Sequence, residues 1–357
     1  MHLPAPKGAP RLPAVLLCLL TVVAMGVAGC AARPTATPSP ASQLTSFHLT
    51  SFKMASETVG WGTSETAILR TTDGGAMWSD VTPSGLPSRP VAGRPSLFYS
   101  EHFLDANAGL AIVPEGQDAG TLLITSNAGR TWDKVAVPFG FAQFSFVDAR
   151  NGWAMAVRGV ADGQMPVDIY RTTDGGKSWA RVSGVDPGTP TPPGGLPIAG
   201  HKNGIVFHDL KTGWAAGFVP AAQSWLFITR DAGRTWQRQD LPLPPGFESS
   251  EINVEPPRLF GAKDGILLEA FYQPGQTPYL NSVFQVTHDG GETWQATTPF
   301  TGSAAYSFLD IAHGFALTSQ PSGGASLLET RDSGRTWTPV PTNIADEPVG
   351  MLQIVSA

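Results

Sequence analysis

An eight-residue phrase, Thr-x-Asp-x-Gly-x-x-Trp, occurs six times along the chain and constrains the fold more than any other feature. The copies begin at Thr71, Thr125, Thr172, Thr229, Thr287 and Thr330. Their tryptophans are 43 to 58 residues apart. Self-similarity at such a period is typical of repeat architectures, and about 40–50 residues is the length of one four-stranded propeller blade. The phrase therefore predicts an all-β chain, a β-propeller of four-stranded antiparallel blades.

The residues of the phrase predict a structural turn between the third and fourth strands. The third position is occupied by Asp73, Asn127, Asp174, Asp231, Asp289 and Asp332, and the last by Trp78, Trp132, Trp179, Trp236, Trp294 and Trp337. An Asp or Asn side chain accepts hydrogen bonds from nearby backbone N–H groups, Gly adopts positive φ, and Trp covers the turn with its ring. One carboxylate is too few for a calcium loop, so a catalytic or calcium-binding role is not expected.

Each repeat also has an upstream half, in which a Phe ends one apolar strand and a Gly precedes the next. Phe146-Val-Asp148-Ala-Arg-Asn-Gly152-Trp153 is an example. The acidic residue recurs as Asp105, Asp148, Asp209 and Asp310, which favours a structural turn residue over one half of a catalytic pair. Together the two halves give four short strands with turn signals between them.

The combined pattern resembles the Asp-box (BNR) repeat over residues 46–340. It is most similar to photosystem II stability/assembly-factor-like repeat proteins, here as a bacterial lipoprotein member, and more distantly to sialidase and sortilin-type propellers. The resemblance implies the fold strongly and the function weakly. Photosynthetic members act as assembly chaperones through a basic patch, and this acidic chain shows no such cluster.

The N-terminus predicts export and a lipid anchor. Residues 1–29 read as a lipoprotein signal peptide, with Lys7 and Arg11 before an uncharged apolar stretch, and small residues lead to Cys30. The Val-Ala-Gly-Cys sequence resembles a lipobox and implies lipidation of Cys30; an ordinary signal peptide or an uncleaved anchor helix are the alternatives. Residues 30–43 form a Pro/Ser/Thr spacer, and residues 44–357 a single propeller domain. The expected location is the extracytoplasmic side of the cell membrane.

Charge and motifs exclude several function classes. Without residues 1–29 the chain has 21 basic and 29 acidic residues, a net charge of −8, and no basic run, so no nucleic-acid partner is expected. No phosphate loop, dinucleotide motif, serine nucleophile motif or metal-ligand spacing occurs, and we expect no cofactor and no metal. His201 and His208 leave a shared metal as a minor alternative. No Arg-Ile-Pro motif occurs in the mature chain, and none of the tyrosines shows the setting of a sialidase nucleophile.

Six copies favour six blades, with seven as the alternative. The tail Val349–Val355 is expected to be a short strand that closes the ring. The stretches 183–205 and 238–258 are rich in Pro and Gly and are interpreted as loops.

The long loops are expected on the rim opposite the phrases, and a rigid scaffold with variable loops suggests a binding face there. Candidate residues of that face are Trp225, Tyr272, Tyr279, Arg158, Arg258, Glu251 and Glu255. Merely tolerated insertions are the alternative. The leading prediction is a non-enzymatic module that binds a protein or peptide partner of the cell envelope. The alternative is a glycan-binding protein or sialidase-like glycoside hydrolase on the same scaffold, for which a central funnel with clustered carboxylates would be diagnostic.

Overall fold

The computed structural model describes residues 48–90, 94–185, 189–219, 223–272, 281–301, 304–319, 325–341 and 352–355. In these ranges every regular element is a β-strand, which confirms the all-β prediction. Within the same ranges we find no helix with the length and apolar character needed to cross a membrane. The predicted signal peptide, Cys30, the spacer and Tyr279 lie outside the described residues.

The strands form six units, and each unit carries one copy of the phrase. Unit 1 has β1 (Ser51–Met54), β2 (Gly60–Thr63), β3 (Ile68–Thr71) and β4 (Ser79–Asp80). Unit 2 has β5 (Ser100–Phe103), β6 (Gly109–Pro114), β7 (Gly120–Thr125) and β8 (Asp133–Val137). Unit 3 has β9 (Ala142–Phe146), β10 (Gly152–Val157), β11 (Val167–Thr172) and β12 (Ala180–Gly184).

The second half of the chain repeats the scheme. Unit 4 has β13 (His201–Phe207), β14 (Gly213–Val219), β15 (Trp225–Thr229) and β16 (Gln237–Arg238). Unit 5 has β17 (Glu251–Val254), β18 (Arg258–Phe260), β19 (Asp264–Tyr272), β20 (Asn281–Thr287), β21 (Gln295–Ala296) and β22 (Phe300–Thr301). Unit 6 has β23 (Ala304–Phe308), β24 (Gly314–Ser319), β25 (Ala325–Thr330) and β26 (Thr338–Pro339).

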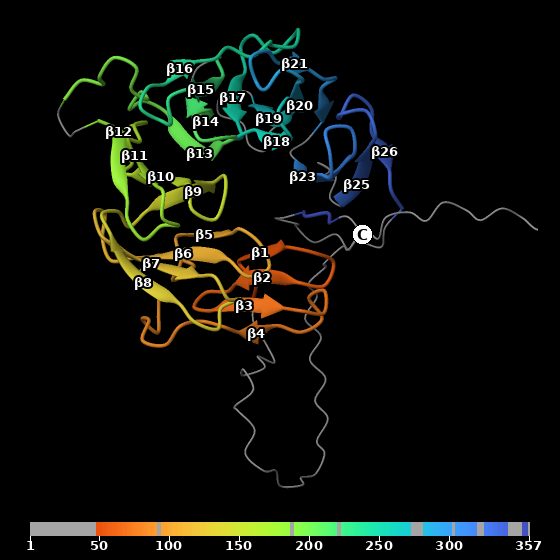
Figure 1. Ribbon diagram of the computed structural model, residues 1–357. Coiled ribbons are helices and arrows are strands. Elements are labelled where there is room, and N and C mark those ends of the chain that lie inside the picture. The colour runs from red at the N-terminus through yellow and green to blue at the C-terminus, as the bar shows by residue number, and fades with distance from the viewer. Residues whose placement is uncertain are drawn as a thin grey trace, which may run out of the picture.

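The units are arranged as a ring around a central opening (Figure 1). Units 1, 2, 3 and 6 are separate four-stranded sheets in which consecutive strands pair antiparallel. Units 4 and 5 share one ten-stranded sheet, because β17 pairs with both β14 and β19. These features fit a β-propeller of antiparallel blades. The number of blades, predicted as six, stays a prediction.

The predicted loop 238–258 is partly wrong, because it contains β17. Ile252 and Val254 are buried while Glu251 and Asn253 between them are half-buried, which is the alternation of a strand with one face in the core. Their backbone extends the sheet of unit 4 through Phe218 and Val219. The other predicted loop, 183–205, likewise ends in a strand, since β13 begins at His201.

The phrase forms the predicted turn between the third and fourth strands of every unit. In the third copy, the Thr172 hydroxyl donates to Asp174 at 2.8 Å, and the same carboxylate accepts the Ser178 N–H at 2.9 Å. Asn127 reproduces this with its amide, since its Oδ1 accepts from Thr125 at 3.1 Å and from the Thr131 N–H at 3.0 Å. These side chains are therefore engaged in holding the hairpin.

The turns between first and second strands lie on the same rim as the phrases. In each unit an N–H of the phrase donates to a carbonyl of that turn, for example from Gly175 to Arg150 at 2.9 Å and from Ala232 to Lys211 at 2.9 Å. We call this side the box rim. Chain connectivity then puts the loops between second and third strands, and those between units, on the opposite rim, as predicted.

The C-terminal tail contacts both ends of the ring, although not as the predicted strand. Residues 352–355 have no strand pairing, and 349–351 lie outside the described residues. The Gln353 side chain accepts from the Met54 N–H at 2.7 Å and donates to the Met54 carbonyl at 2.8 Å. Next to it, the Ile354 N–H donates to Ser307 Oγ of unit 6 at 3.0 Å. An amide side chain thus substitutes for one step of a ladder between units 6 and 1.

Candidate functional site

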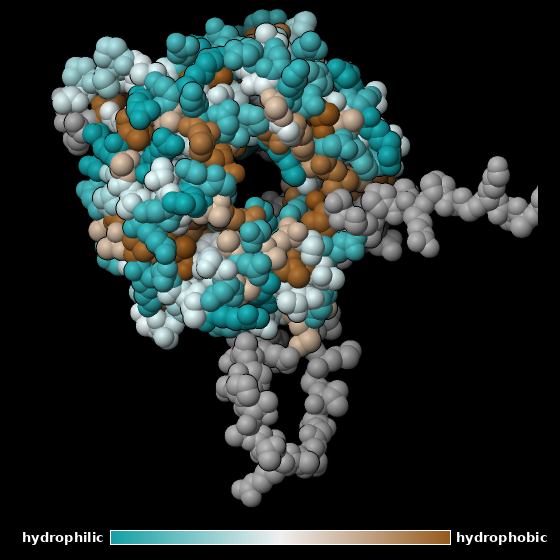
Figure 2. Space-filling view, viewed as in Figure 1, coloured by the Kyte–Doolittle hydropathy of each residue, from teal (hydrophilic) through white to brown (hydrophobic). Residues whose placement is uncertain are grey.

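The first strands of the units form the inner wall of the ring. Neighbouring first strands are bonded in series: Lys53 Nζ donates to the Phe103 carbonyl at 2.6 Å, the Phe207 N–H to Ser145 Oγ at 2.8 Å, and Asn203 Nδ2 to Asn253 Oδ1 at 2.6 Å. The labels of β1, β5, β9, β13, β18 and β23 accordingly surround the opening in Figure 1. Figure 2 shows that side chains leave this centre hollow. These strands therefore line the channel, although some of their polar side chains also pack between units, as His102 does against Phe146 and Tyr306 against Phe284.

This wall carries a group of ionisable side chains, which we call the channel belt. It consists of Lys53, Glu101, His102, Glu255, Arg258 and Tyr306, all exposed or half-buried. They come from units 1, 2, 5 and 6. At the equivalent register positions, units 3 and 4 carry Phe144 and Ile205, which are buried in the core.

Strand register places the belt residues at three successive positions of the ladder between first and second strands. Each unit has a glycine near the start of the strand that pairs with its first strand, and positions are counted from this glycine. Lys53 and Arg258 pair with the first residue after it, Trp61 and Ile266. Glu101 and Tyr306 pair with the second residue, Ala111 and Ala316. The Glu255 N–H bonds to the carbonyl of the third, Leu268. Two residues of strand rise separate these positions along the channel, about 7 Å.

Lys53 and Arg258 make the belt locally cationic. Burial, and next the charge of Arg258, lower the pKa of Lys53, while burial lowers the pKa of Arg258 even though water in the channel reaches its side chain. Among the described residues neither side chain forms an ion pair. Two cations that repel each other on one wall favour a ligand that brings hydrogen-bond acceptors.

Glu101 and Glu255 are the carboxyls of the belt. Burial raises the pKa of both, against opposing hydrogen bonds. Glu101 Oε1 accepts from the hydroxyls of Ser51 and Thr63, the latter at 3.3 Å. Glu255 Oε1 accepts only a long bond of 3.4 Å from Asn253 Nδ2 among the described residues. Glu255 is therefore the carboxyl more easily kept protonated, and Glu101 the one better supported as a carboxylate.

His102 and Tyr306 complete the belt. Burial, then the Lys53 charge, lowers the pKa of His102 to about 4, so its imidazole is neutral at neutral pH. The pKa of Tyr306 is raised by burial and next by Glu255, and Arg258 opposes this. The ring brings Tyr306 into the electrostatic range of Glu255 and Arg258, about fifty residues away along the chain, a proximity that the sequence did not indicate.

The residues predicted for one binding face are distributed over several places. Glu255 and Arg258 belong to the channel belt. Glu251 pairs in the ladder with Tyr272, whose ring lies 5.5 Å from that of Phe218.

Arg158 and Trp225 lie elsewhere and are already occupied. Arg158 pairs with Asp118 at 3.0 Å and with Asp168 at 3.4 Å. Trp225 is only 4% exposed, and Lys202 Nζ lies 5.0 Å from its ring centre. The Trp225 ring is therefore core and offers no surface for a partner.

Sequence reasoning missed Lys53, Glu101, His102 and Tyr306. The only sequence signal for them is that the repeats carry different residue types at these positions. Units 1 and 3 have Phe52 and Phe144 where units 2 and 6 have Glu101 and Tyr306. Within the described ranges no group of three or more His, Cys, Asp or Glu side chains could hold a metal ion.

Comparison with known protein families supports the identification of the repeated phrase as an Asp-box. The model of the BNR/Asp-box repeat matches residues 285–296, which hold the fifth copy of the phrase. A xyloglucanase from Hypocrea jecorina (strain QM6a) is 27% identical over 259 residues, which make up 62% of this chain and 29% of that protein. This chain thus spans less than a third of the length of that relative.

Two solved structures illustrate the fold. The GH74 xyloglucanase from Xanthomonas campestris has a TM-score of 0.54 at 16% identity, over 85% of this chain and 47% of that one. YCF48 bound to D1 peptide has a TM-score of 0.32 at 17% identity, over 68% and 82% of the chains, too low to carry an argument. The Asp-box propeller resemblance is confirmed, whereas the closer similarity to photosystem II factors is not.

The relative also corrects the functional prediction. The curated protein that matches this chain is an enzyme named xyloglucanase. This finding contradicts the predicted non-enzymatic binding module and favours the alternative, a protein that acts on glycans.

Proposed function

We propose that the chain is a glycoside hydrolase that cleaves an extracytoplasmic polysaccharide of the xyloglucan class in its central channel. The observation that carries the proposal is that two half-buried carboxyls, Glu101 on β5 and Glu255 just before β18, come from opposite sides of the central opening (Figure 1), and burial raises the pKa of both. The name of the curated relative supports the substrate class. Paired carboxyls that differ in environment are the usual machinery of glycoside hydrolysis.

The environments of the two carboxyls suggest their roles. Glu255, held only by the long amide bond, serves as the acid that protonates the departing glycosidic oxygen. Glu101, supported by two hydroxyls, serves as the carboxylate that assists at the anomeric carbon. The glycosidic C–O bond breaks, water supplies the new hydroxyl on the anomeric carbon, and its remaining proton restores the acid. Lys53 and Arg258 donate hydrogen bonds to sugar oxygens nearby.

The test is release of new reducing ends from xyloglucan and from a panel of other β-glucans. We expect Glu255→Gln and Glu101→Gln each to lower the rate by about 10²–10⁴-fold, the usual contribution of a positioned acid or base. Glu65→Gln is the matched control, because Glu65 is an exposed glutamate outside the belt.

Three results bear on the proposal. Loss of activity in both belt variants but not in the control supports it, provided that all proteins unfold at similar temperatures. Activity retained in Glu255→Gln would refute the role of that acid. If the wild-type chain retards the polysaccharide in affinity electrophoresis and yields no reducing ends, the chain binds glycan without cleaving it.

We further propose that the domain is displayed on the membrane surface by a lipid on Cys30 and comprises six blades. The small residues before Cys30 and the six copies of the phrase support this. The closer kinship with photosystem II stability/assembly-factor-like repeats is proposed on the combined Phe-x-Asp and Thr-x-Asp pattern alone. Intact-mass measurement of the mature protein tests the anchor, since cleavage before Cys30 with acylation gives a defined mass.

A further inference from the structure

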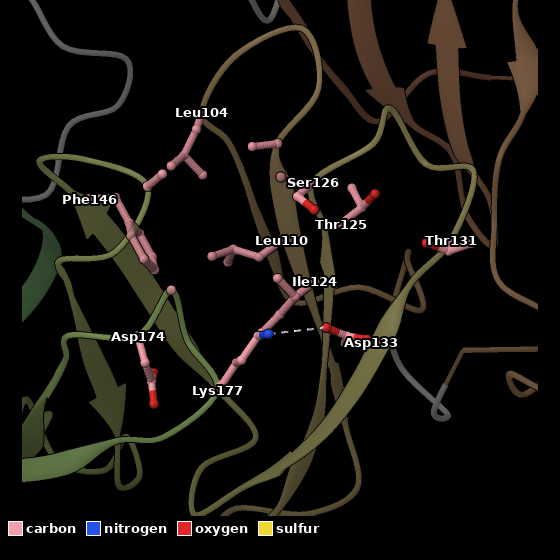
Figure 3. A pocket seen from close by; sticks show the side chains of 14 residues that line it. Leu104, Leu110, Ile124, Thr125, Ser126, Thr131, Asp133, Phe146, Asp174 and Lys177 are labelled. Carbon is pink, nitrogen blue, oxygen red and sulfur yellow. Dashed lines mark ion pairs between the residues drawn. The ribbon is translucent and has the colours of Figure 1, made fainter.

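A cavity lies between units 2 and 3 on the box rim. Its volume is about 190 Å³. Figure 3 shows Leu104, Leu110, Ile124 and Phe146 turned towards its middle. At its edge Lys177 pairs with Asp133 at 3.8 Å, and both side chains are well exposed. The site is thus an apolar slot with a polar, accessible mouth.

At two corresponding interfaces the same space is filled by a tryptophan of the preceding unit. Trp61 of unit 1 stacks on Phe103 of unit 2 with ring centres 5.0 Å apart. Trp153 of unit 3 stacks on Phe207 of unit 4 at 3.7 Å, with planes 6° apart. Both indoles are completely buried. An indole against the phenylalanine of the next unit is therefore a regular element of this core.

Leu110 occupies the tryptophan position at the interface of units 2 and 3. Like Trp61 and Trp153, it follows the glycine near the start of the second strand and faces the next unit. Phe146 is the counterpart of Phe103 and Phe207, and one of its faces lies close against its own Gly152. Leu110 is smaller than an indole and leaves the slot open, while the ring centres of His102 and Trp179 lie 5.6 Å and 6.1 Å from that of Phe146.

The slot also offers the hydrogen-bond acceptor that Trp153 uses, whereas Trp61 Nε1 donates to the Asp105 carbonyl at 2.8 Å. Trp153 Nε1 donates to the carbonyl of Ala232 at 2.9 Å, and Ala232 precedes the central glycine of the next unit's phrase. Gly175 has the same place in the third copy, and it lines the slot. Within the described part of the chain no group donates to the Gly175 carbonyl.

We propose that this slot binds one planar aromatic ring that carries an N–H donor, an indole in particular. The ring would stack on Phe146, as Trp61 and Trp153 stack on the equivalent phenylalanines, and it would donate to the Gly175 carbonyl, as Trp153 does to that of Ala232. An apolar cavity of about 150 Å³ lined by such side chains takes up benzene, so the size is suitable for an aromatic ring. The source is either a free indole compound or a tryptophan side chain presented by a peptide.

The test uses the full chain with indole and with N-acetyltryptophanamide as probes, in calorimetric and ligand-observed NMR titrations. Wild type should bind indole saturably, and Leu110→Trp, which supplies the missing ring, should weaken binding at least tenfold and raise the unfolding temperature. Binding of N-acetyltryptophanamide as well assigns the slot to a side chain, and binding of indole alone assigns it to a free compound.

Val160→Trp is the matched control, because Val160 is 57% exposed and outside the slot. Should Leu110→Trp not fold, Leu110→Phe provides a smaller filling of the same space. Lack of saturable binding to wild type, or equal binding by wild type and the filled variants, would overturn the proposal. Neither result depends on glycan hydrolysis.

Discussion

Replacing Glu269 by Gln should remove a pH-dependent penalty from the core of unit 5. Glu269 is completely buried on β19. Its Oε1 accepts from Ser224 Oγ at 2.6 Å and its Oε2 from Gln285 Nε2 at 2.5 Å. Burial raises the pKa of this carboxyl from 4.5 to about 7, against those two hydrogen bonds. The described partners of Glu269, Ser224 and Gln285, are neutral, so no cation compensates its charge when it ionises.

The sign and size follow from that pKa. Because the folded pKa lies above the unfolded one, the contribution of Glu269 is fully present below pH 4.5 and is lost as pH rises to about 7. At about 1.4 kcal/mol per unit, the free energy of unfolding falls by about 3 kcal/mol over this window. A Gln at this position is neutral throughout and avoids this loss of stability. However, its NH2 group can take the place of the oxygen that accepts from Gln285 Nε2, and losing that hydrogen bond costs about 1 kcal/mol.

The assay is urea unfolding of wild type and Glu269→Gln at pH 4.5 and at pH 8. The variant should be slightly less stable at pH 4.5 and more stable at pH 8, with a difference between the two comparisons of about 3 kcal/mol. The comparison with wild type is essential, because His102 has the opposite effect in an overlapping window. The pKa of His102 is lowered to about 4, so its contribution to stability is lost as pH falls from 6.5.

A stability difference between the two proteins that is equal at both pH values would refute the reasoning, since it would mean that Glu269 is ionised in the folded protein at acid pH. Glu292→Gln serves as the control. Glu292 lies on the exposed box rim and pairs with Arg230. Because its side chain is exposed, the substitution should change stability by less than about 0.5 kcal/mol.

Three further changes test the scaffold by chemical denaturation. Gly291→Ala should lower the free energy of unfolding by about 3 kcal/mol, because the φ of Gly291 is 84° and a Cβ there would overlap Trp214. Gly290→Ala should lower it by only about 1 kcal/mol, since other copies of the phrase carry Ala at that position. Gln353→Ala should cost about 1–3 kcal/mol, because it removes both bonds that join the tail to β1. Lys202→Met should cost about 2–4 kcal/mol and expose residues 198–200 to hydrogen exchange, because its ammonium holds three carbonyls at 2.9–3.0 Å.

Controls for these three changes lie on the surface. Gln237→Ala on exposed β16 and Lys177→Met at an exposed site should each change stability by less than about 0.5 kcal/mol. Equal costs for Gly290→Ala and Gly291→Ala would contradict the reasoning about Trp214. Unchanged stability of Gln353→Ala would mean that the tail does not close the ring.

The sequence was sufficient for the units and their turns, because every copy repeats the same local chemistry. A threonine hydroxyl, an Asp or Asn side chain and a glycine of positive φ close a hairpin without help from the rest of the chain. Such short-range bonds can be read from spacing alone. The exception was β17, where proline-rich flanks concealed a short alternating strand.

Glu255 and Arg258 were predicted as binding-face residues, but the channel belt as a group could not be predicted, because its members are related only by closure of the ring. Lys53 and Arg258 share a level through strand register in separate units, with about two hundred residues between them. Neither belongs to a motif, and each alone resembles an ordinary surface residue. The alternation of apolar and polar residues predicts which strand face is buried, but it does not say which faces meet across a channel.

Both candidate sites lie where the copies differ, and symmetry explains why. A feature present in all six units, such as the hydrogen bond from Thr172 to Asp174, gives six equivalent environments and cannot select one ligand position. Selectivity requires a departure from the repeat, such as Glu101 where unit 3 has Phe144, or Leu110 where unit 3 has Trp153. Such a departure removes side-chain packing that the repeat would otherwise provide. Filling the slot with Leu110→Trp should therefore stabilise the fold and weaken ligand binding.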